Sequence, residues 1–168
     1  MTASKAKDLF RQITEEYFGG KSTVIFANQS RQPKPEIPLV TLMPGNAKRP
    51  LAANNSVVND ALISHFQTRL PITVDLFTNG KPVYDDENGV EVGSENTAVD
   101  EMISYMDFLS SEYVIAWCNR NDVAIGFEGD VQDVTGLINE TTYEFRSRLV
   151  ALIYYTHKTT GTKSATVD

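Results

Sequence analysis

The sequence predicts an α+β domain in which two or three helices cover one mixed, mostly antiparallel β-sheet with extended loops. Apolar residues recur at helical spacing near the N-terminus and in residues 97–119, and they alternate at strand spacing in residues 57–78 and 143–155. The 168 residues are 41% hydrophobic and include one cysteine. A single domain, residues 1–168, is therefore expected to fold around one core without a disulfide.

The N-terminal part is expected to form one helix and two short strands. Four apolar residues recur at helical spacing and share one face: Ala6, Phe10, Ile13 and Tyr17. They predict a helix over residues 3–18, which Gly19–Gly20 ends because glycine accepts the left-handed conformation. Residues 24–27 and 37–43 predict two strands. Pro38 lacks a backbone donor, so the second strand is expected to begin at an edge or to enter the sheet there.

The middle of the chain is expected to hold a long strand and a helix separated by an acidic insertion. Residues 44–55 contain Pro, Gly and Asn and predict a long loop or arm, and the alternation in residues 57–78 predicts a long strand or a bent pair of strands. Residues 81–96 are rich in Gly and acidic residues and predict an exposed insertion. Residues 97–119 predict a helix, which Ser110–Ser111 can break in two.

Two strands are expected to complete the sheet. Residues 123–127 predict a short strand, residues 128–142 a turn-rich connector, and residues 143–155 the longest uninterrupted strand. One face of that last strand is largely apolar, whereas the other is charged up to Arg148 and apolar beyond it. Such a sheet is expected to be partly exposed and partly covered by a helix or a neighbouring subunit. Residues 156–168 are expected to form a polar tail.

Charge is segregated along the chain. Residues 1–81 contain 10 basic and 6 acidic side chains, residues 82–119 contain 9 acidic and no basic ones, and the net charge of the whole chain is −7. Nucleic-acid binding is disfavoured, because non-specific affinity depends on basic side chains that neutralise phosphates. No apolar run approaches the roughly 20 residues of a membrane helix, so we expect a cytosolic chain without membrane contact.

No catalytic or metal-binding pattern emerges from the sequence. His65 and His157 lack ligands at metal-binding spacing, and we interpret them as a strand-surface residue and a tail residue. Cys118 is expected to be a small buried hydrophobe. Residues 84–95 match a calcium loop in part, but Tyr84 replaces the first carboxylate, so a solvated acidic loop is the expected state. We expect no cofactor, no metal and no enzymatic activity.

The C-terminal third resembles the tailed-bacteriophage neck and tail terminator proteins, which complete the tail and join it to the head. The similarity rests on the spaced apolar residues of 131–138, followed by a strand that begins Tyr143-Glu144-Phe145-Arg146 and continues in alternating apolar residues. The opening is also similar, with a helix, a strand, a proline-containing loop and the strand Pro38–Leu42. The insertion at 81–96 lies outside the resemblance.

The resemblance implies a structural virion protein at the tail neck, made in the host cytoplasm. Its members form a ring, usually a hexamer, that caps the tail tube and joins it to the head connector. The implied partners are other copies of the chain, tail tube and sheath proteins, and connector or adaptor proteins, while DNA passes through the lumen without specific binding. Two alternatives stay open: a head–tail connector adaptor, and a small cytosolic ligand-binding or enzyme domain.

Opposite charges could meet between neighbouring subunits of such a ring. The basic candidates for docking on a neighbour or partner are Arg31, Lys34, Lys48, Arg49, Arg146 and Arg148. The acidic candidates for facing a neighbour or the lumen are Asp85, Asp86, Glu87, Glu91 and Glu95. The alternative for each of these residues is a solvated surface, and for Arg146 and Arg148 an intrachain pair with Glu144 or Asp130.

Overall fold

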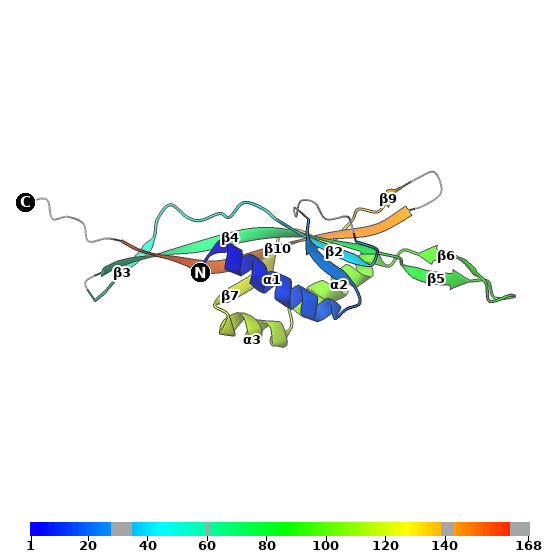
Figure 1. The fold of residues 1–168 in the computed structure, drawn as a ribbon, viewed down its shortest axis with the longest axis horizontal. Coiled ribbons are helices and arrows are strands. Elements are labelled where there is room, and N and C mark those ends of the chain that lie inside the picture. The colour runs from blue at the N-terminus through cyan, green and yellow to red at the C-terminus, as the bar shows by residue number, and fades with distance from the viewer. Residues whose placement is uncertain (28–34, 60, 139–142, 162–168) are drawn as a thin grey trace, which may run out of the picture.

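The computed structural model describes residues 1–27, 35–59, 61–138 and 143–161, so Arg31 and Lys34 lie outside the described residues (Figure 1). Its three helices are α1 (Ala3–Phe18), α2 (Ala98–Leu109) and α3 (Glu112–Arg120). Its strands are β1 (Thr23–Phe26), β2 (Leu39–Pro44), β3 (Asn54–Val58), β4 (Ala61–Thr78), β5 (Lys81–Tyr84), β6 (Glu91–Glu95), β7 (Val123–Phe127), β8 (Gln132–Asp133), β9 (Gly136–Leu137) and β10 (Tyr143–Thr160).

The main sheet has the order β1-β2-β4-β10-β7, with β3 paired to β4, and β8 and β9 paired to β10. β1 and β2 run parallel, and the other pairs are antiparallel. A separate sheet contains β5 and β6. The predicted α+β class with a mixed, mostly antiparallel sheet is thus confirmed.

Two long central strands form the spine of the molecule. β4 and β10 each have 18 residues, which corresponds to about 60 Å at the usual rise of a strand. They stay paired from Phe145 opposite Thr78 to Thr160 opposite Ile63, and in Figure 1 they follow the long axis. β10 therefore continues five residues beyond its expected end at Tyr155, into the segment expected as a polar tail.

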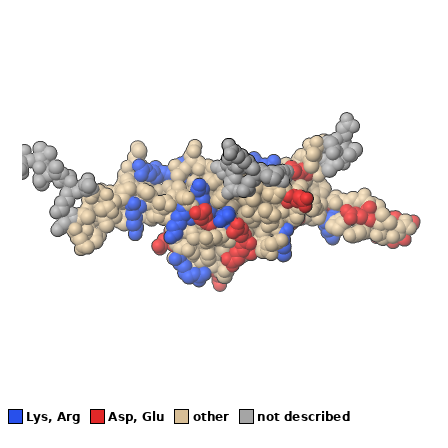
Figure 2. Space-filling model, in the orientation of Figure 1, with Lys and Arg blue, Asp and Glu red and all other residues tan. Residues whose placement is uncertain are grey.

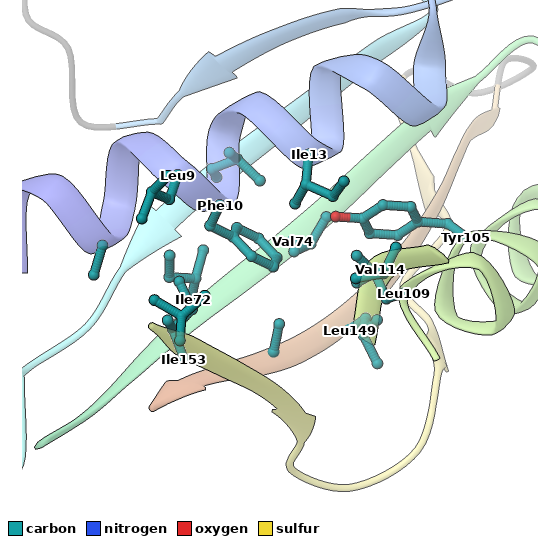
Figure 3. Close-up of a cluster of buried hydrophobic side chains, with 14 of the residues drawn as sticks. Leu9, Phe10, Ile13, Ile72, Val74, Tyr105, Leu109, Val114, Leu149 and Ile153 are labelled. Carbon is teal, nitrogen blue, oxygen red and sulfur yellow. The ribbon is translucent and has the colours of Figure 1, made fainter. Parts of the chain in front are cut away.

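The three helices cover one face of the central sheet and bury the core there. Phe10 and Ile13 of α1 and Tyr105 of α2 pack with Val74 and Leu149 of the spine, and all five are at most 1% exposed (Figure 3). Each such side chain contributes about 1.5–3 kcal/mol by its burial. The helical and strand periodicities found in the sequence thus describe the two layers of this core.

Local signals explain how the helices begin and end. The Thr2 hydroxyl accepts a hydrogen bond from the backbone N–H of Lys5 at the start of α1, and Gly19 ends the helix with φ +50°. The expected break at Ser110–Ser111 is confirmed, because the Ser111 hydroxyl caps the start of α3. The predicted bounds of α1 and β7 match the structure.

Two expectations about the ends of the spine need correction. The predicted strand from residue 57 is a hairpin in its first part: Val57 and Val58 end β3, Asn59 turns with φ +50°, and β4 starts at Ala61. The acidic insertion at 81–96 is exposed as expected, but it contains the β5–β6 hairpin where a loop was expected. Both faces of that hairpin are exposed, so its strands lack the alternation by which a half-buried strand is recognised.

Candidate assembly surfaces

The acidic hairpin, residues 81–95, continues from the Thr78 end of β4 and extends away from the helices (Figure 1). The Asp85 carboxylate closes its turn by accepting hydrogen bonds from the backbone N–H of Glu87 and from the Asn88 side chain. Gly89 supports that turn with φ +63°. The carboxylates predicted to face a neighbour therefore lie together on one structural unit: Asp85, Asp86, Glu87, Glu91 and Glu95.

Apolar side chains accompany these carboxylates on the hairpin. Four are between 42% and 65% exposed: Val83, Tyr84, Val90 and Val92. A two-stranded hairpin with both faces in water is marginally stable by itself. The hairpin thus combines negative charge with apolar surface that this chain leaves uncovered.

A second extension, the arm, lies at the opposite end of the spine. We define the arm as β3 with residues 61–68 of β4 and 156–160 of β10. Lys48 forms an isolated bridge with Arg69 near its base, through backbone hydrogen bonds of 2.7 and 2.8 Å. This arrangement places two like charges opposite one another. The Arg49 guanidinium lies 4.6 Å from the ring centre of Phe66.

The cations of this region lack a salt bridge to any described residue: Lys48, Arg49, Arg69 and Lys158. The predicted docking residues Lys48 and Arg49 are both exposed. Figure 2 shows basic side chains between the helices and the arm and a cluster of acidic side chains on the hairpin. Five of the nine acidic residues of 82–119 thus lie on the hairpin at one end of the molecule, and the other four lie on α2 and α3.

Asp75 holds Arg146 and Arg148 on the sheet face away from the helices. Arg146 Nη2 donates to Asp75 Oδ2 at 2.6 Å, and Arg148 donates to both carboxylate oxygens at 2.7 and 3.1 Å. The carboxylate is 5% exposed. Burial raises its pKa, but the hydrogen bonds from Arg148 and Arg146 outweigh burial and hold the pKa of Asp75 below its usual range.

The intrachain alternative named Glu144 or Asp130 as the partner of these two arginines, whereas the acceptor that the structure places between them is Asp75. The sequence carried one usable signal for it, since Asp75 is a lone carboxylate inside an apolar strand pattern. The Arg146 guanidinium also lies 4.8 Å from the ring centre of Phe77. The side chains of Arg146 and Arg148 stay partly in water, at 29% and 34% exposure.

The remaining candidates of the sequence take structural positions. His65 lies on the arm, where its Nε2 is 3.0 Å from the Ser56 hydroxyl. The placement of His157 in a tail is wrong, because it lies in β10 with Nδ1 at 3.0 Å from the Met1 carbonyl. Cys118 is buried as expected, and burial raises the pKa of its thiol. Among the described residues, no group of three or more His, Cys, Asp and Glu could hold a metal ion.

Comparison with known families decides the class of protein. Residues 7–168 match the family model described as phage neck terminator protein. The chain belongs to this family. Neck terminators are structural proteins of the virion tail and interact with other head and tail proteins of the phage. No curated protein sequence gives a significant match to this neck terminator. Within the described ranges, no helix is long and apolar enough to cross a membrane.

Proposed function

We propose that this neck terminator forms a hexameric ring that caps the tail tube and joins it to the head connector. The observation that carries the proposal is that cations near one end of the spine and carboxylates at its other end form no salt bridge with any described residue. Two different complementary patches on each subunit give a head-to-tail contact, and such a contact closes into a ring when its rotation divides the full circle. The net charge of −7 favours passage of DNA through the ring without specific binding.

Docking on the neighbour or on a tail or connector protein is assigned to Lys48 and Arg49 near the arm and to Arg146 and Arg148 near the hairpin end of the spine. Lys48 and Arg49 are exposed and free of ion pairs to described residues. Arg146 and Arg148 stay in the proposal because their side chains remain 29% and 34% exposed. These contacts would set register and partner choice more than raw affinity.

The test compares particles made with the normal protein, without it, and with the double variant Lys48→Glu and Arg49→Glu. We expect electron microscopy to show joined particles with the normal protein, but separate heads and tails with a tube of irregular length without it. The double variant should lose joining, whereas the matched reversal Lys81→Glu, on the acidic hairpin, should retain it. Normal joining by the Lys48 and Arg49 variant would contradict the docking assignment.

Whether the protein binds the tail or the head is tested by looking for it on isolated tails and isolated heads. A terminator should remain on isolated tails from a phage that lacks its connector. Recovery on isolated heads, with tails of normal length in its absence, would instead establish a connector adaptor. A protein missing from both structures would contradict any role in the neck.

A further inference from the structure

We propose that the acidic hairpin of one copy docks on the arm of the next copy in the ring. This inference rests on the proposed function, since it specifies the contact between the ring subunits. It names both surfaces: residues 81–95 on one side, and on the other side the arm with its basic residues. The second copy of this chain is the occupant of each surface.

The hairpin has exposed apolar side chains that a partner could bury and carboxylates that a partner could pair with cations. All the residues of β5 and β6 are exposed, and Val92 is exposed to 65%. Asp85 uses its carboxylate within the turn, whereas Asp86, Glu87, Glu91 and Glu95 form no salt bridge with a described residue. A neighbour that fits this hairpin must therefore offer both apolar side chains and cations.

The arm offers this combination. None of the described helices covers β3, and Val57 is 70% and Leu62 44% exposed on the same face of paired strands. Arg49 lies over Phe66 on that same face, whereas Lys158, opposite His65, and Lys48, opposite Arg69, lie on the other face of the strands. The arm and its base therefore present apolar side chains with Arg49 on one face and three cations on the other. The two surfaces are thus complementary in charge and alike in apolar exposure.

The spine prevents the hairpin from reaching the arm of its own chain. Arg69 marks the base of the arm and Thr78 the start of the connection to the hairpin, and both belong to the continuous strand β4. Nine residues of strand separate them by about 30 Å. The pairing of the two surfaces must therefore occur between copies. Each copy then gives its hairpin to one neighbour and its arm to the other, which is the heterologous contact of a ring.

Cysteine cross-linking in assembled particles tests the contact. The variant with Val57→Cys and Val92→Cys, treated with a short bis-maleimide, should give a ladder of covalent oligomers up to the closed ring. Each single variant should give none, and Cys118 is 6% exposed and should not react. In a control, Ile115→Cys on the exposed face of α3 replaces Val57→Cys. A ladder from that control, or particles that contain the Val57 and Val92 variant without a ladder, would overturn the proposal.

Charge exchange gives a second test that does not depend on the cysteines. Reversal of the hairpin, Glu91→Lys with Glu95→Lys, should reduce incorporation into particles by about tenfold, because like charges then meet. Reversal of the arm, Lys48→Glu with Lys158→Glu, should do the same. A chain that carries all four changes should recover to near the normal level. No recovery would overturn the hairpin–arm contact.

These experiments separate failure of the contact from failure of the proposed function. If particles contain the unmodified protein but both tests fail, the neck role of the protein stands and the hairpin–arm contact is rejected. Particles from which the unmodified protein is absent would reject the neck role itself. Recovery in the four-change chain supports both the contact and the ring.

Discussion

Replacement of Asp75 by asparagine is expected to lower the free energy of unfolding by about 3 kcal/mol. Asp75 is 5% exposed, and its carboxylate accepts three hydrogen bonds of 2.6–3.1 Å from Arg146 and Arg148. Removal of one partner from a buried ion pair costs about 3–5 kcal/mol. The lower end of this range applies because the two arginine side chains are 29% and 34% exposed and can be hydrated when the carboxylate is removed.

Thermal unfolding followed by circular dichroism measures this loss. For a chain of this size, about 3 kcal/mol corresponds to a decrease in Tm of about 6–12 °C. The control is Asp130→Asn, an exposed carboxylate whose replacement should change the free energy of unfolding by less than about 0.5 kcal/mol. A loss below about 1 kcal/mol for Asp75→Asn would refute the assignment of this cluster as a buried, ionised anchor.

The stability that Asp75→Asn removes is expected to depend on pH. The pKa of Asp75 is lowered in the folded chain, so its contribution to stability is complete above the pKa of the unfolded state, about 4. The contribution is lost as the pH falls through the lower folded-state pKa. The stability difference between the normal chain and Asp75→Asn should therefore shrink at pH 3 relative to pH 7. An equal difference at both pH values would contradict the electrostatic account.

Two further substitutions test the core and the connection between β4 and the hairpin. Tyr105→Phe removes the buried 2.7 Å hydrogen bond between the Tyr105 and Thr14 hydroxyls. It should lower the free energy of unfolding, measured in urea, by about 1 kcal/mol. An unchanged urea midpoint would contradict this. Gly80→Ala should speed proteolysis of the hairpin, because φ is +71° and the new Cβ would lie 2.2 Å from the Glu95 carbonyl oxygen. Gly129→Ala, with φ +77° and no atom within 4 Å, controls for backbone strain alone.

The sequence predicts best where one face of an element is buried. The apolar spacing of residues 3–18 reproduces α1, and the run 123–127 reproduces β7, because burial against a single core imposes a clear period on each. The hairpin at 81–95 has no buried face, so its strands leave no such pattern and could not be distinguished from an irregular loop. The same cause explains the missed strand at 156–160, whose side chains are mostly polar.

The candidate site was predictable in its charge but not in its pairing. Counting along the chain is enough to place the acidic block beside residue 85 and the basic residues before it. The Asp75 cluster depends on the register that places Arg148 opposite Asp75, 73 positions further along the chain. Separation in sequence conceals such a partner, and only the topology of β4 and β10 brings it into contact.

The spine gives the two assembly surfaces a fixed relation to one another. Ring closure requires a constant angle between the contact that a subunit gives and the contact that it receives. β4 and β10 carry the arm at one end and the hairpin at the other, and their buried core and the Asp75 cluster hold the strands together between these ends. If the hairpin and arm meet as proposed, Gly80 is the point where that angle can change, since it joins the hairpin to the spine in a conformation closed to a Cβ. A change at Gly80 should therefore alter ring closure even where the core remains intact.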